Sequence, residues 1–289
     1  MANSNPNDVG RALEYSIVDY IQNNHNKVLL SHDTLLMQKR DSIKFEKLQQ
    51  NLKERFLVAS QKFLAWFLSL NVNKTTITID RFNDNSGSVS DLSINNVNFS
   101  IKHNHDALKH PRPYSLAQQC GFAKGSNEDK IHRKNMFAVS NDYRNSLNEL
   151  TKYNQDKNLL FKLYENVNQA CAQSLNEWLK ININSALNFF NFIVGTNFYK
   201  IIVKEDKNVP IIEIQDFLNV PQPNNFVCRT DPNRKNYINI KFNHDWVIDL
   251  RLHNAATNIE LDQKKQLSLK FDARKIEGKI NSQYIICST

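Results

Sequence analysis

Residues 90–106 read SDLSINNVNFSIKHNHD, and their pattern gives the clearest indication of the fold. Apolar and polar residues alternate on both sides of Asn95-Asn96, which is typical of two β-strands joined by a tight turn. Asparagine tolerates the positive φ angles that a two-residue hairpin turn requires. The sequence therefore predicts an antiparallel hairpin. Its register pairs Ile94 with Val97, Ser93 with Asn98, Leu92 with Phe99 and Asp91 with Ser100.

The two faces of this hairpin carry different side chains, because successive residues of a strand point to opposite faces. One face is apolar and is expected against a core: Leu92, Ile94, Val97, Phe99 and Ile101. The other face is polar: Asp91, Ser93, Asn98, Ser100 and Lys102. Opposed Cβ atoms lie roughly 4.5–5.5 Å apart and diagonal ones about 7–8 Å, so Asp91 and Lys102 can share a ligand. Two interpretations remain: a solvated outer face, or a site for a metal and a phosphate.

Phosphodiester hydrolysis gives a reason to place an acid and a lysine on one rigid sheet face. It needs a carboxylate for Mg²⁺ and a cation near the phosphate and the attacking water. The strand also runs into a donor-rich segment, where Lys109 and Arg112 are candidates for contacts with DNA phosphates. The chain has a net charge of +8 and a pI near 9.2, which favours a polyanionic partner.

The composition is that of an ordinary soluble globular protein, with 289 residues, 40% hydrophobic and 23% charged. The four cysteines form no C-x-x-C pair, so no zinc framework is expected and reduced thiols fit best. The N-terminus has no apolar stretch typical of a signal peptide. The segment FLVASQKFLAWFLSL is too short to span a bilayer and contains Lys62. We expect a cytoplasmic protein without membrane association.

Helical periodicity dominates the first part of the chain. Asp8 is predicted to cap a helix that buries Leu13, Ile17 and Ile21. A second long helix is predicted over 42–70, a strand over 75–82 and a loop over 83–88. A short helix is expected in LAQQCGFAKG, residues 116–125, ending at a glycine. Residues 141–192 are predicted to be largely helical.

From Thr196 onward the pattern changes to short strands. They are predicted at 197–205, 209–217, 236–242, 245–254 and 266–274, with a turn-rich break at 220–225. The fold class is therefore α/β (α+β), with a mixed sheet flanked by helices and additional C-terminal strands. We expect one domain over 1–289, with a catalytic core at 8–135, a helical segment at 141–192 and a β-rich segment at 196–289 for DNA recognition.

Glu14 lies at the edge of the apolar face of the first helix, three and four residues before Ile17 and Val18. A carboxylate there is costly unless it has a partner. Glu14 is therefore either salt-bridged or partly exposed at the edge of that face, or it is a site residue that the first helix contributes.

Other polar clusters have weaker patterns. His103 and His105 suggest a metal site, but the ligand spacing of compact ββα-metal nucleases is absent, so a phosphate contact or a structural role is favoured. Gln118 can bond to adenine edges or simply be exposed. Arg251, His253 and Asn254 end a strand, where arginine suits guanine and asparagine suits adenine. A polar end of an edge strand is the alternative for these three.

The pattern D-x(8)-S-x-K, formed by Asp91, Ser100 and Lys102, resembles the PD-(D/E)-x-K nuclease superfamily. That superfamily uses an acid, then an acid-x-lysine on the neighbouring strand, and often a glutamate on an early helix, which Glu14 matches. Ser90 replaces the usual proline, and Ser100 replaces the usual second acid. The resemblance leaves the second acid to Glu14, Asp106 or Glu128.

Segments spread over most of the chain are similar to type II restriction endonucleases of the HaeIII type. These segments are GRALEY, SIKHNHDALKHPR, DLRLHNAATNIE and SLKFDAR. The resemblance implies Mg²⁺-dependent cleavage of double-stranded DNA at a short site such as GGCC, a homodimer and a cognate DNA methyltransferase.

The resemblance also assigns roles to residues. Asp91, the Ile101 carbonyl and Glu14 would hold the metal, Lys102 would position the water and contact the phosphate, and Ser100 would support them. Two rival functions remain. One is a less specific nuclease on the same core, and the other is a non-enzymatic basic DNA-binding protein.

Overall fold

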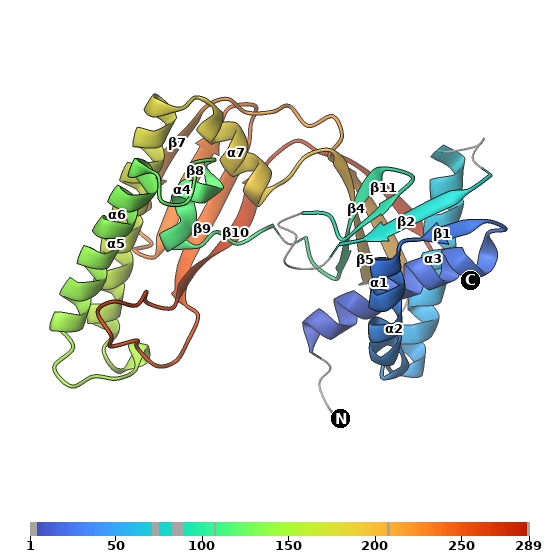
Figure 1. Cartoon of the computed structure of the whole chain (residues 1–289), viewed down its shortest axis with the longest axis horizontal. Coiled ribbons are helices and arrows are strands. Elements are labelled where there is room, and N and C mark those ends of the chain that lie inside the picture. The colour runs from blue at the N-terminus through green and yellow to red at the C-terminus, as the bar shows by residue number, and fades with distance from the viewer. Residues whose placement is uncertain (1–4, 71–74, 83–88, 107, 207–208, 288–289) are drawn as a thin grey trace. The chain divides into compact units, whose positions relative to one another are not determined.

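Figure 1 shows the computed structural model of the chain, which describes residues 5–70, 75–82, 89–106, 108–206 and 209–287. The chain forms two compact units. Unit 1 consists of Met1–Asp106, Thr196–Val220 and Ile280–Thr289, and unit 2 of Ala107–Gly195 and Pro221–Lys279. The predicted core at 8–135 and the β-rich segment at 196–289 each contribute residues to both units. That the chain acts as one endonuclease domain stays a prediction.

The described part of unit 1 contains a seven-stranded mixed sheet in the order β1-β2-β3-β4-β5-β6-β11. Its strands are β1 (Val28–Leu30), β2 (Ile77–Arg81), β3 (Leu92–Ile94), β4 (Val97–His103), β5 (Phe198–Asp206), β6 (Val209–Asp216) and β11 (Asn281–Ile286). The pairs β1–β2 and β4–β5 are parallel and the other pairs are antiparallel. The mixed sheet is as expected, but β1 and β11 had not been predicted. The predicted loop at 83–88 lies outside the described residues.

Three helices of unit 1 are described: α1 (Pro6–Asn24), α2 (His32–Glu46) and α3 (Gln50–Leu70). The single helix predicted over 42–70 is wrong, because the chain turns between α2 and α3. Leu48 N–H donates to the Phe45 carbonyl (3.0 Å) in this turn, and both side chains are buried.

The predicted cap of α1 is also wrong. Asn5, not Asp8, is the N-cap, and its side chain accepts a hydrogen bond from Asn7 N–H (3.1 Å). Pro6 occupies the first turn, where its missing N–H costs nothing. Asp8 lies in the first turn, where its charge complements the helix dipole, and it pairs with Lys44 (3.0 Å).

The hairpin adopts the predicted register for its three inner pairs, from Leu92–Phe99 to Ile94–Val97. Asn95 and Asn96 have φ angles of 51° and 66°, as a two-residue turn of this kind requires. Asp91 precedes β3, and its backbone N–H donates to the Phe99 carbonyl (2.8 Å).

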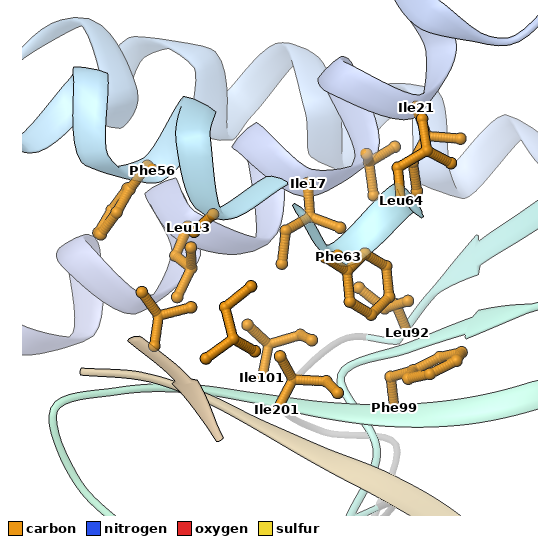
Figure 2. Close-up of a cluster of buried hydrophobic side chains, with 14 of the residues drawn as sticks. Leu13, Ile17, Ile21, Phe56, Phe63, Leu64, Leu92, Phe99, Ile101 and Ile201 are labelled. Atoms are coloured by element: carbon orange, nitrogen blue, oxygen red, sulfur yellow. The ribbon is translucent and has the colours of Figure 1, made fainter. Parts of the chain in front are cut away.

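Figure 2 shows the core beneath this hairpin, where side chains of α1 and α3 meet those of the sheet. The labelled members are Leu13, Ile17, Ile21, Phe56, Phe63, Leu64, Leu92, Phe99, Ile101 and Ile201. The Phe63 and Phe99 rings form an edge-to-face pair with centroids 5.4 Å apart. Each fully buried side chain of this size contributes roughly 1.5–3 kcal/mol. A register slip would lose several of these contributions, so the core fixes which hairpin residues face away from it.

Unit 2 contains a four-stranded antiparallel sheet in the order β10-β9-β8-β7. Its strands are β7 (Phe226–Thr230), β8 (Tyr237–Phe242), β9 (Val247–Asn254) and β10 (Leu269–Glu277). Its helices are α4 (Leu116–Gln119), α5 (Asn127–Asn145), α6 (Lys157–Ile181) and α7 (Asn184–Ile193). Strand β7 had not been predicted. The short helix α4 ends as predicted near a glycine, since Gly121 has a φ of 92°.

The helices α5 and α6 run alongside each other, and α6 packs against β7 (Figure 1).

All four cysteines are buried free thiols. Among the helices of the described ranges, none combines the length and apolarity needed to cross a membrane.

Candidate functional site

Asp91 is the centre of a compact polar cluster at the start of β3. Its Oδ2 accepts hydrogen bonds from Lys102 Nζ (2.8 Å), the Ile101 backbone N–H (2.6 Å) and Ser100 Oγ (3.2 Å). The side chains of Asp91 and Lys102 are 24% and 22% exposed, so solvent reaches both. Ser100 is buried. The structure thus brings together the acid, serine and lysine of the sequence pattern.

The backbone of Ile101 explains why a main-chain oxygen belongs to this cluster. In a strand, the N–H and C=O of one residue point to the same side, as in residue pairs that exchange both hydrogen bonds. Ile101 N–H is directed at Asp91, where the paired part of β3 has ended. The Ile101 carbonyl therefore faces the same side, and Ile101 lines the cavity described below.

Glu14 reaches this cluster from α1, which the buried side chains of Leu13 and Ile17 hold against the sheet. Its Oε2 accepts a hydrogen bond from Arg81 Nη2 (2.7 Å), and its side chain is 15% exposed. Of the alternatives expected for Glu14, the salt bridge is therefore present. The same side chain also lines the cavity with Asp91.

The pKa of Glu14 is raised to about 7. Burial is the main cause, and repulsion by the Asp91 carboxylate is the next. Arg81 and Lys102 oppose the shift. The Arg81 guanidinium also pairs with Asp41 (3.0 Å), so two carboxylates share this one cation. A divalent cation bound between the two carboxylates of Glu14 and Asp91 would offset their mutual repulsion.

Arg81 was not identified from the sequence. Its side chain is buried and donates to Glu14, to Gln38 Oε1 (2.8 Å) and to Asp41. A signal was present, because Arg81 occupies the same phase of β2 as the buried Ile77 and Ile79. An arginine on the inward phase of an alternating strand requires a buried acidic partner.

A cavity of about 250 Å³ lies against this cluster. It is lined by Pro6, Asn7, Gly10, Arg11, Glu14, Asp91, Ile101, Lys102, His103 and His105. Two carboxylates and a carbonyl are hard oxygen donors, and Mg²⁺ commonly keeps several waters beside one or two carboxylates. The donor set therefore fits Mg²⁺. Within the described residues, no group of three His, Cys, Asp or Glu side chains is arranged to hold a metal, so His103 and His105 complete no such set.

The other two candidates for the second acid are placed differently. Asp106 accepts a hydrogen bond from the buried Lys200 (2.6 Å) and lies near Gln215 Nε2 (3.4 Å). Glu128 lies in the first turn of α5, in unit 2. Of the three candidates, Glu14 is the one that lines the cavity together with Asp91.

The residues predicted to contact DNA all belong to unit 2, and two of them, Arg251 and His253, contact an acid that had not been predicted, Asp272. Asp272 accepts hydrogen bonds from Arg251 Nη2 (2.7 Å) and pairs with His253 Nε2 (3.0 Å). Arg112 is exposed, and its charge acts on His110, as does that of Asp272. The pKa of His110 is lowered, chiefly by burial.

The other three predicted DNA contacts make internal interactions. Gln118 donates to Asp129 (3.2 Å), and Asn254 accepts a hydrogen bond from Tyr164 (3.0 Å). The Lys109 ammonium lies 4.9 Å from the centre of the Phe192 ring, and burial lowers the pKa of Lys109. Their role in binding DNA stays a prediction.

Comparison with known proteins returned no relative. No protein-family model matches the chain, and no curated protein or solved structure matches it.

Proposed function

We propose that this chain is a Mg²⁺-dependent type II restriction endonuclease whose unit 1 has the PD-(D/E)-x-K fold. The observation that carries the proposal is one cavity lined by Asp91, Ile101, Lys102 and Glu14. Two carboxylates, a carbonyl and a lysine are the groups that hydrolysis of a phosphodiester requires. Glu14 lies on α1, Ile101 and Lys102 lie on β4, and Asp91 directly precedes β3, and the core packs these elements together.

The residues divide the work according to their chemistry. Asp91, Glu14 and the Ile101 carbonyl would hold Mg²⁺, which would stabilise the charge that develops on the phosphate oxygens. Lys102 Nζ has three donors and directs one at Asp91, so two remain for a phosphate oxygen and the attacking water. Ser100 keeps the Asp91 carboxylate oriented through its hydrogen bond.

In the reaction, the water oxygen attacks phosphorus in line with the leaving sugar oxygen. A new P–O bond forms, the P–O bond to one sugar breaks, and the products are a phosphate monoester and a sugar hydroxyl. The water proton passes to solvent or to a carboxylate of the cavity, and the leaving sugar oxygen takes a proton from a solvent water. The cleavage of both strands at a palindromic site such as GGCC calls for a homodimer, since a two-fold site matches a two-fold protein. A cognate DNA methyltransferase would protect the host chromosome.

The test is digestion of unmethylated phage DNA by the wild type and Lys102→Ala, with Mg²⁺ and with EDTA. Lys39→Ala, an exposed lysine on α2, is the matched control. We expect discrete Mg²⁺-dependent bands from the wild type and the control, and none from Lys102→Ala.

Other outcomes would contradict parts of the proposal. A smear would indicate the less specific nuclease. Bands that persist in Lys102→Ala would exclude this cavity as the catalytic centre. A folded wild type that binds DNA without cutting several substrates would indicate the non-enzymatic DNA-binding protein.

A further inference from the structure

The two faces of the unit 2 sheet differ sharply in chemistry. One face is apolar and buried, and its members are Phe226, Cys228, Ile238, Ile240, Phe242, Ile248, Leu250, Leu252 and Phe271. Rings such as Phe190 of α7, which meets Phe242 at 5.4 Å, cover part of this face. Side chains of the opposite phase must point to the other face.

That other face is basic. We use the term basic sheet face for the side of β7–β10 that carries Arg229, Lys241, Arg251, His253, Lys270 and Arg274. The register places these residues on one side, because directly opposed residues of paired strands share a face. Arg229 pairs with Asn239, Asn239 with Asp249, and Asp249 with Arg274 across all four strands.

The acids on this face are already neutralised by internal partners. Asp249 accepts hydrogen bonds from Arg234 Nη2 (2.8 Å) and Asn239 Nδ2 (2.9 Å). Asp272 is held by Arg251 and His253. These carboxylates therefore leave little negative charge to offset the remaining cations.

The remaining cations of this face are not held by a carboxylate in this way. Within the described ranges, Arg229, Lys241, Lys270 and Arg274 make no ion pair with a carboxylate. Arg229, Lys241 and Arg274 are exposed. His253 lies on the same face, where Nε2 faces Asp272 (3.0 Å) and Nδ1 faces the Asn254 carbonyl (3.0 Å). Like charges gathered on one sheet face repel one another unless an anionic partner offsets them.

We propose that the basic sheet face is the surface of unit 2 that binds the phosphate backbone of duplex DNA. The choice of duplex DNA rests on the proposed function. Arginine and lysine side chains on such a face supply the sequence-independent contacts that set register on the duplex.

The experiment measures binding of a fluorescent duplex of mixed sequence by the full-length chain, in EDTA, over a range of salt concentrations. The test variant is Arg229→Gln/Lys241→Gln/Arg274→Gln. The control is Lys130→Gln/Lys134→Gln/Lys162→Gln, which removes the same charge from exposed lysines of α5 and α6. We expect the test variant to bind at least about tenfold more weakly. The plot of log binding constant against log salt concentration should also become less steep by about 2–3, since each phosphate contact contributes about 0.9 to that slope. The control variant should stay close to the wild type.

Several outcomes would overturn the inference. Equal losses in both variants would show that net charge, not this face, drives binding. Unchanged binding by the test variant would place the DNA surface elsewhere. Single-stranded RNA or phosphatidylserine vesicles that displace the duplex as well as unlabelled duplex does would contradict the choice of duplex DNA. If the triple variant is thermally unstable, the three single variants are measured in its place. Each is expected to reduce the steepness of the salt dependence by about 0.9.

Digestion with Mg²⁺ in parallel separates this inference from the proposed function. A wild type that cuts DNA, together with a test variant that binds normally, would refute the surface and leave the nuclease. A wild type that never cuts, together with a test variant that has lost binding, would refute the nuclease and leave the surface.

Discussion

The Asp91 carboxylate and the Lys102 ammonium lie 2.8 Å apart, eleven residues from each other in the sequence. The same Asp91 oxygen accepts the Ile101 N–H, so side chain and main chain hold one carboxylate in place. This pair is the centre of the proposed site, and removal of either charge leaves the other without its partner.

Asp91→Asn should abolish cleavage while the fold survives. The amide oxygen can still accept the Ile101 N–H, but the charge that would hold a divalent cation is lost. We expect a cleavage rate at least about 10³-fold lower and a free energy of unfolding within about 1 kcal/mol of the wild type. Single-turnover cleavage and urea denaturation measure the two effects, with Asp19→Asn on α1 as the control. Cleavage near the wild-type rate would mean that another carboxylate is the essential one.

Glu14 should make the stability of the protein depend on pH. Its folded-state pKa of about 7 lies above its unfolded value, so the folded state holds the proton more tightly. Stability from this group is complete below pH 4.5 and is lost as the pH rises to about 7. Glutamine does not titrate, so the Glu14→Gln variant should not lose this stability. Between pH 4.5 and about 7, the free energy of unfolding of the variant should therefore rise relative to that of the wild type, by up to about 3 kcal/mol. Parallel curves from urea denaturation between pH 4.5 and 8 would contradict the raised pKa.

Arg81 should be a major determinant of stability. Its removal leaves the carboxylates of Glu14 and Asp41 without a buried counter-charge. We expect Arg81→Met to cost about 3–5 kcal/mol, as is usual when one partner of a buried pair is removed. Lys53→Met, which removes an ion pair to the 72%-exposed side chain of Glu46, should cost at most about 1 kcal/mol. Chemical denaturation compares the two, and similar losses would show that the Arg81 network contributes little.

Arg251 should govern base discrimination if it reads guanine. Asp272 fixes the guanidinium, whose planar fork can bond to the two acceptors of a guanine edge. Arg251→Lys keeps the charge and loses the fork. We expect the variant to bind non-specific duplex normally and to lose roughly 5- to 100-fold in preference for the cognate site. Competition binding between cognate and scrambled duplexes measures the ratio, and an unchanged ratio would assign base recognition to other residues.

The hairpin could be predicted from the sequence because its determinants are local. Alternation fixed the faces, and Asn95-Asn96 fixed the turn and hence the register. The short strands β1, β7 and β11 were missed because three to six residues without clear alternation carry no such signal. The partner of Glu14 was missed for a different reason. Arg81 lies 67 residues away, and only the packing of α1 and α2 on the sheet brings the two together.

The placement of β4 also determines when the sheet of unit 1 can close. One edge of β4 pairs with β3, which directly precedes it, but the other pairs with β5, and Ser100 lies opposite Lys200. At roughly 5–20 residues per second, a ribosome needs about 5–20 s to make the hundred residues between these two positions. During that interval the nascent chain carries an unpaired β4 edge beside residues that will line the cavity. The helices of unit 2 are synthesised within the same interval, but its strands follow β5, so the β4 edge is open to pairing with other chains until β5 arrives.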